Sequence, residues 1–122
     1  MVSRASAKWI PERGDIIYVS PHAGKEMPGF HPLLVASPKI FNERTGIVIG
    51  FPMTHAAFNA DNPFAVAVQG PKGEIGYVLA HQPKSFDWVE RGASTHPWGG
   101  GHANVLKAVL SKIDAICGIC DH

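Results

Sequence analysis

Three short apolar stretches set the fold of this chain: residues 47–51 (IVIGF), 64–68 (FAVAV) and 75–79 (IGYVL). β-Branched and aromatic side chains favour strands. The run 47–51 is apolar throughout, so we expect it to be a central strand with both faces buried. The segment Gln69 to Gly73 is typical of a turn and joins the other two stretches as a hairpin.

Two further strands are predicted on the N-terminal side of this centre. Residues 14–20 (GDIIYVS) have the composition of a buried strand, and residues 33–37 (LLVAS) form another between Pro32 and Pro38. Residues 21–31 hold two prolines and two glycines without an apolar period, so they predict a long surface loop. Residues 41–46 are turn-like and residues 54–62 predict a second loop. Five strands result.

The last third of the chain has a helical pattern. Residues 99–101 are three glycines that predict a flexible joint, and apolar side chains then recur at helical spacing from Val105 to Cys117. Lys107, Ser111, Lys112 and Asp114 fall on the other face, so the apolar stripe should pack on the sheet. The fold class expected is α+β, mainly β: one domain spanning 1–122, its core at about 12–120, built as a small SH3-like barrel with a C-terminal amphipathic helix.

Composition narrows the class of protein. The chain has 122 residues, 45% of them hydrophobic and 17% charged, which suits one domain with a single core. Its formal net charge of +1 is far from the strong basic excess of non-specific nucleic-acid binders. The sequence contains neither a secretory signal nor a run long and apolar enough to span a membrane, so we expect a cytoplasmic protein that does not enter membranes.

Cys117 and Cys120 form one C-x-x-C pair close to the C-terminus. Two thiolates with His122 would be zinc ligands, but a tetrahedral site needs a further ligand at suitable spacing, and none is found. A redox pair would lie at the start of a helix, whereas this one lies at a helix end. We therefore expect a frayed helix end, with no metal and no cofactor.

Six segments of the chain resemble the MazF/PemK toxin family in order and spacing. The start at 14–19 is similar to G-D-[IL]-[IV]-[WY]-V, and the loop 24–29 is similar to G-x-E-x-x-G. Residues 32–38 (PLLVASP) resemble a P-x-[LV]-V-[LV]-S-P strand, and residues 52–54 and 62–64 resemble P-x-T and x-P-F. Residues 79–88 (LAHQPKSFDW) resemble L-A-D-Q-V-K-S-[LI]-D-W. Collinear agreement of this length is hard to obtain by chance.

This resemblance implies a toxin of a toxin–antitoxin system that inhibits translation and growth. It implies a barrel of the CcdB/PemK type, a symmetric homodimer whose clefts bind single-stranded RNA, and sequence-selective, metal-independent endoribonuclease activity on mRNA. It also implies neutralisation by a cognate MazE/PemI-like antitoxin. Two departures from the pattern fall at positions that matter for activity: His31 stands where the family has an arginine counted as catalytic, and His81 stands where it has an aspartate.

Metal-free RNA cleavage needs a base, an acid and donors for the charge on the phosphorane. The resemblance assigns Thr54 a hydroxyl donor role. His31 can give or take a proton near neutral pH, which a guanidinium cannot do as a base, although an imidazole lacks the two-pronged grip on phosphate. Glu26 is the carboxylate at a family-matched loop position. These three residues are the predicted catalytic set. Each residue also has a non-catalytic interpretation. His31 would be a substitution in a toxin that has lost or weakened its activity, Thr54 would cap a local turn with its hydroxyl, and Glu26 would be an exposed surface acid.

The predicted RNA-binding residues come from three segments. Loop cations would meet the phosphate backbone, an aromatic ring in the second loop would stack on a base, and polar side chains of 79–88 would hold phosphate and base edges. Each could equally be an ordinary surface residue. The set comprises Lys25, Lys39, Arg44, His55, Phe58, Gln82 and Lys84.

Two other readings stay open from the sequence. The same barrel could be a catalytically weakened homologue that binds RNA or an antitoxin after the arginine was lost. A gyrase-poison-like toxin of the CcdB type would share the barrel and act on a protein, although the segment 79–88 points away from it.

Overall fold

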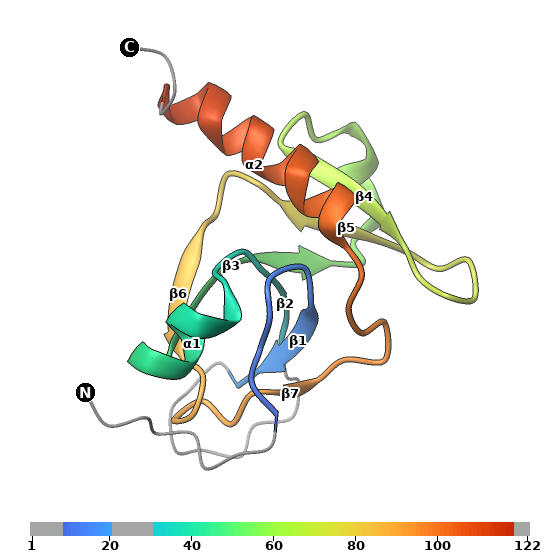
Figure 1. Cartoon of the computed structure of the whole chain (residues 1–122). Helices are drawn as coiled ribbons and strands as arrows, with labels where there is room; N and C mark the ends of the chain where they lie inside the picture. The colour runs from blue at the N-terminus through green and yellow to red at the C-terminus, as the bar shows by residue number, and fades with distance from the viewer. Residues whose placement is uncertain (1–8, 21–30, 119–122) are drawn as a thin grey trace.

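The computed structural model describes residues 9–20 and 31–118, and within them the chain forms a mostly antiparallel sheet with helices against it (Figure 1). The strands are β1 (Ile16–Val19), β2 (His31–Val35), β3 (Ile47–Thr54), β4 (Ala65–Gln69), β5 (Ile75–Leu79), β6 (Lys84–Asp87) and β7 (Ser94–Thr95). The helices are α1 (Lys39–Thr45), the 3₁₀ helix η1 (Ala57–Asp61) and α2 (Ala103–Cys117).

The sheet follows the order β4-β5-β3-β2-β1-β7, with β6 paired to β3 off this path. Strand β3 is the centre, as predicted. Its first half pairs with β6, its middle with β2 and its last two residues with β5. Figure 1 shows β3 passing from the β6 end of the molecule to the β5 end. One continuous strand therefore ties the two halves of the sheet together.

Strand alternation divides the interior into two hydrophobic clusters. Ile16 and Leu34 pack in one cluster, with Met53, Val78 and the α2 residues Leu106 and Val109. Their chain neighbours Ile17 and Leu33 face the other way and pack with Val48 and Trp88. Because successive strand residues point to opposite faces, β1 and β2 are buried on both sides. The expected class, mainly β with a C-terminal helix packed on the sheet, is confirmed.

Asn42 is a fully buried polar residue that joins distant segments. Its Nδ2 donates to the carbonyl oxygens of Pro11 at 2.8 Å and Ser37 at 3.1 Å, and its Oδ1 accepts from the Ser37 hydroxyl at 2.5 Å. The Asn42 carbonyl accepts from Trp88 Nε1 at 2.8 Å, and Ser37 Oγ accepts from the Ile49 N–H at 2.9 Å. This network fixes α1 against the N-terminal segment and β3.

Several details of the sequence prediction are wrong. The stretch 41–46 is not a turn, because residues 39–45 form α1, and the described chain has seven strands instead of five. Strand β3 runs to Thr54, and Ile49 is 40% exposed, so the expectation of burial on both faces fails there. Strand β2 begins at His31, which was predicted to lie in the loop. Strands β6 and β7 are short and polar, so their pattern did not reveal them.

Candidate functional site

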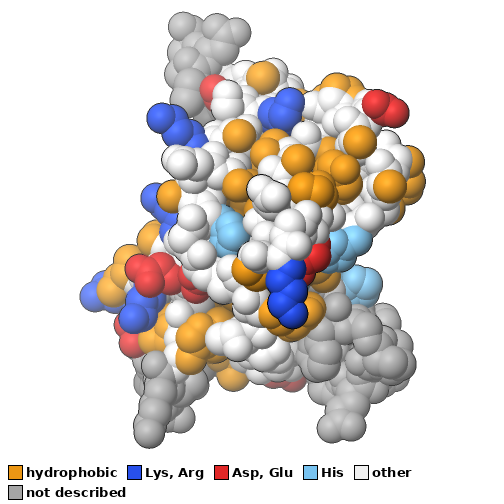
Figure 2. Space-filling view, turned by 90° about the vertical axis from the view of Figure 1, so that its right-hand side faces the viewer, with side chains coloured by type: hydrophobic (Ala, Val, Ile, Leu, Met, Phe, Trp, Pro, Cys, Tyr) orange, Lys and Arg blue, Asp and Glu red, His pale blue; other side chains and the backbone are white. Residues whose placement is uncertain are grey.

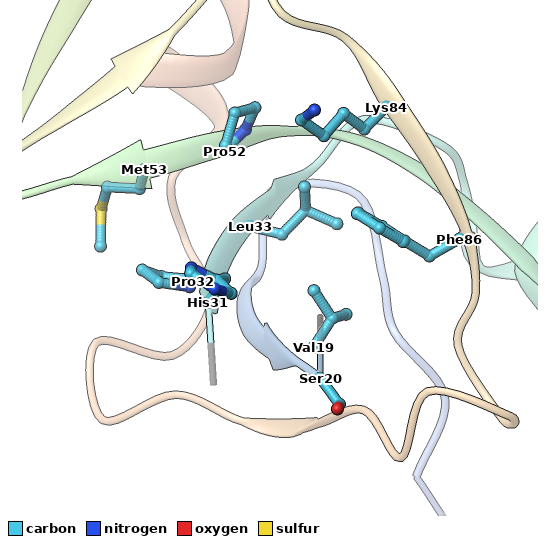
Figure 3. Close-up of a pocket in the computed structure, with 9 residues that line it drawn as sticks. All are labelled: Val19, Ser20, His31, Pro32, Leu33, Pro52, Met53, Lys84 and Phe86. Atoms are coloured by element: carbon cyan, nitrogen blue, oxygen red, sulfur yellow. The ribbon is translucent and has the colours of Figure 1, made fainter. Parts of the chain in front are cut away.

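The pocket beside His31 has a volume of about 330 Å³ and lies where β1, β2, β3 and β6 meet (Figure 3). In Figure 3, Lys84 extends along β3 toward Pro52, while Phe86 projects from β6 toward Leu33. The residues that line it are Val19, Ser20, His31, Pro32, Leu33, Pro52, Met53, Lys84 and Phe86.

Strand register places these side chains around one cavity. His31 is paired with Val19, and Lys84 is paired with Gly50 of β3. Lys84 and Phe86 are two residues apart on β6, so their side chains share a face. A side chain at Gly50 would put its Cβ 2.3 Å from the Leu34 carbonyl oxygen, so glycine is needed for β2 and β3 to approach here. The hydrogen-bonded strand pairs β1–β2, β2–β3 and β3–β6 therefore fix the positions of the residues that line the pocket.

His31 begins β2 and Thr54 ends β3, the strand next to it. The pairing of these two strands runs from Val35–Gly50 to Leu33–Pro52 and stops two residues short of both side chains, and Thr54 is paired with Tyr77 of β5. Thr54 Oγ1 accepts the Ala56 N–H at 3.2 Å, which leaves its hydroxyl proton for another acceptor. The turn-capping alternative for Thr54 is therefore realised, and it is compatible with a donor role. Thr54 is not among the residues that line the pocket.

The pocket is suited to an anion. Of the nine lining residues, His31 and Lys84 alone are ionisable, and both are solvent-exposed. No carboxylate lines it within the part of the chain that the structure describes. Cationic side chains at the mouth of a low-dielectric cleft raise the local concentration of negatively charged ligands. The structure thus brings together one catalytic and one RNA-binding residue of the predicted set.

The other predicted residues lie elsewhere. Lys39 and Arg44 are exposed as expected, but they lie on α1 and do not line the pocket, so their assignment to a loop is wrong. Gln82 is exposed, and its Nε2 lies 3.3 Å from His81 Nε2. Glu26 and Lys25 fall outside the described residues.

Residues 54–62 supply two of the predicted RNA-binding side chains. His55 Nδ1 lies 3.2 Å from the Ile75 carbonyl oxygen, and its ring meets Trp98 edge-on at 5.4 Å, so it packs against the protein. Phe58 on η1 is 77% exposed and remains open for a contact.

Sequence reasoning missed a cluster of imidazoles around Trp98. His96 Nδ1 accepts the Trp98 N–H at 3.0 Å, and His102 Nε2 lies 2.9 Å from the Trp98 carbonyl oxygen. Burial lowers the pKa of His96, and the nearby His55 and His102 lower it further. Figure 2 shows histidines at mid-height of this face, below an area of hydrophobic side chains. Only the number of histidines in the sequence hinted at such a group.

The C-terminal cysteine pair is only partly described. Cys117 is the last residue of α2 and is exposed, while Cys120 lies outside the described residues. Among residues 9–20 and 31–118, no group of three or more His, Cys, Asp or Glu side chains is arranged to hold a metal ion. No helix in that part of the chain is long and apolar enough to cross a membrane.

Comparison with known proteins identifies the family. The model of the PemK-like, MazF-like toxins of type II toxin–antitoxin systems matches residues 12–117. The chain belongs to this family. The expectation of a toxin of the endoribonuclease class is confirmed at that level, because a curated relative, the endoribonuclease toxin MazF of Escherichia coli strain K12, is 34% identical over 97% of this chain and 100% of its own length.

Solved MazF structures agree with the fold. Crystalline MazF from Deinococcus radiodurans superposes with a TM-score of 0.75 at 32% identity, covering 92% of this chain and 100% of that one. A MazE–MazF crystal structure from the same organism gives a TM-score of 0.76 at 31% identity, covering 91% of this chain and 98% of the other. The MazF-like fold therefore extends across nearly all of the chain.

Proposed function

We propose that this MazF-like toxin cleaves single-stranded RNA at selected sequences without a metal ion, and that His31 transfers a proton in the reaction. One observation carries the proposal: a pocket in which, among the residues that the structure describes, the ionisable lining side chains are the His31 imidazole and the Lys84 ammonium group. The name of the E. coli relative, an endoribonuclease, supports RNA as the substrate.

The reaction that fits these groups is transfer of the phosphate to the neighbouring 2′-oxygen. The 2′-oxygen attacks phosphorus while the bond from phosphorus to the 5′-oxygen breaks, which leaves a 2′,3′-cyclic phosphate and a 5′-hydroxyl end. A base takes the 2′-hydroxyl proton and an acid supplies a proton to the departing 5′-oxygen. An imidazole can fill either role, so His31 is the natural proton carrier here.

The remaining groups would stabilise negative charge on the phosphorane. Lys84 faces the same pocket as His31 and replaces part of the charge that an arginine would supply. Thr54, the last residue of β3, would donate its hydroxyl proton to a phosphorane oxygen. Glu26 remains the predicted partner that orients His31 or acts as the base, and Lys25 remains a predicted phosphate contact.

Incubation of the full chain with a long unstructured RNA in excess EDTA tests this proposal. We expect fragments that end in 2′,3′-cyclic phosphate, with a shared sequence at the mapped ends. Binding without cutting would instead support the weakened homologue, and inhibition of DNA supercoiling would support the gyrase-poison reading. Either result would overturn the nuclease proposal.

Matched variants assign the roles. His31→Ala should lower the cleavage rate at least about 100-fold, as loss of a general acid or base does. Lys84→Met should lower it about tenfold, because an exposed cation is partly screened by solvent and salt. Lys107→Met, an exposed lysine on α2 away from the pocket, is the control and should leave the rate unchanged. Equal rates for all three variants would refute the assignment.

We further propose a homodimer whose RNA clefts an antitoxin covers. The crystal structure of MazE with MazF from D. radiodurans supports an antitoxin as the partner. Sedimentation of the purified chain tests the dimer, since a monomer at all concentrations would contradict it. Addition of a MazE-like antitoxin should suppress cleavage, because toxin and antitoxin would compete with RNA for one surface.

A further inference from the structure

We propose that the pocket holds one unpaired nucleobase beside the scissile phosphate, with the ring of Phe86 as its stacking surface. Phe86 is then a specificity-determining residue. This inference rests on the proposed RNA cleavage and names a part of the substrate that the cavity accepts.

The pocket has an apolar part that binding of a phosphate does not explain. A phosphate is strongly hydrated and would lie at the mouth, near the exposed His31 and Lys84. Behind them the cavity is walled by apolar side chains, among which Leu33 is 1% exposed and Met53 is 4% exposed. Displacing water from such a wall is favourable only for an apolar or planar group. The inner part of the pocket therefore calls for a second chemical group joined to the phosphate.

The ring of Phe86 is held in place before any ligand arrives. It packs against the cluster that contains Val48 and Trp88, and Phe86 is paired with Val48 in the β3–β6 register. The Arg91 guanidinium lies 5.2 Å from its ring centroid, and the side chain of Phe86 lines the pocket. A ring fixed in this way loses little freedom when a base stacks on it.

The size and charge of the cavity favour a nucleotide over a protein side chain. A volume of about 330 Å³ lies at the small end of ligand pockets, which suits one base with its sugar. A nucleotide carries a planar base and an anionic phosphate one sugar apart, matching an apolar interior with an ammonium group and an imidazole at its mouth.

Sequencing of cleavage ends from a random-sequence RNA tests the inference. The wild type should prefer particular bases at one position next to the cut, and Phe86→Leu should flatten the preference at that position alone. Phe86→Trp should keep a preference there, because it retains a stacking surface. Phe64→Leu is the matched control: Phe64 is 42% exposed, contacts His81 and lies outside this pocket, so this variant should keep the wild-type pattern.

Binding separates this inference from the proposed cleavage. The probes are an uncleavable 2′-O-methyl RNA of the preferred sequence, or of random sequence if nothing is cut, and N-acetyl-tryptophanamide. Phe86→Leu should weaken RNA binding about tenfold, in line with the worth of one stacked base. Unchanged RNA affinity and end preferences in Phe86→Leu would overturn the inference while leaving the nuclease intact. Binding of tryptophanamide without binding of RNA would assign the pocket to a protein side chain and would also overturn it.

Discussion

Replacing Asn42 by alanine should destabilise the fold more than any exposed substitution. The change removes three side-chain hydrogen bonds from a fully buried site: two that Nδ2 donates to Pro11 and Ser37 carbonyls, and one from the Ser37 hydroxyl. At roughly 1 kcal/mol net for each bond, the loss is about 3 kcal/mol before the unpaired carbonyls are counted. That is a large part of the roughly 5–15 kcal/mol that stabilises a domain.

Urea unfolding followed by tryptophan fluorescence measures this loss. Asn42→Asp keeps the shape and the acceptor for the Ser37 hydroxyl, but turns an oxygen toward two carbonyl oxygens, so we expect an equal or larger loss. Asn104→Ala, an exposed position near the start of α2, is the matched control and should be neutral. A loss below about 1 kcal/mol for Asn42→Ala would refute the accounting of these bonds.

Three other outcomes follow from the structure. Burial lowers the pKa of His96, so below about pH 6.5 the unfolded chain binds a proton that the folded chain does not. The free energy of unfolding in urea should therefore be highest above that pH and fall as the pH drops toward the lowered pKa. His96→Asn should make this free energy depend less steeply on pH. Gly70→Ala would place a Cβ 2.4 Å from Trp98 Cε2, and the ring must move, so we expect a loss of about 1–3 kcal/mol in urea unfolding and a changed tryptophan spectrum. RNA affinity should fall with salt, and Lys84→Met should lower the slope of log affinity against log salt by about one; an unchanged slope would remove Lys84 from the phosphate contact.

The sequence predicted those strands and helices whose own residues show a clear apolar pattern. The strand 75–79 has the predicted bounds, and the apolar stripe of α2 gave the C-terminal helix to within two residues at its start. Helix α1 was missed because seven residues are too few to show a helical period, and its stability comes from the buried Asn42 network. Strand β6 was missed because its pairing with β3 is a long-range contact that polar residues such as Lys84 do not signal.

Some residues of the site could be named from the sequence, and others are recognised only in the folded chain. His31 and Lys84 were named as candidates from the resemblance, but their meeting in one pocket depends on two separate strand pairings. Phe86 was not among the predicted site residues, because nothing local distinguishes a ring at a pocket wall from a ring in a core. The imidazoles around Trp98 come from residues 55, 96 and 102, and only the folded chain brings them together.

Strand β3 also limits how chains of this kind can change in length. Within its eight residues, β3 is hydrogen-bonded to β2, β5 and β6. Successive residues of the strand point to opposite faces of the sheet. One inserted residue after Gly50 would turn Met53 toward the opposite side of the sheet and move Met53 and Thr54 out of register with Val78 and Tyr77 of β5. Insertions and deletions are therefore tolerated in the connections between strands, while β3 itself has to keep its number of residues.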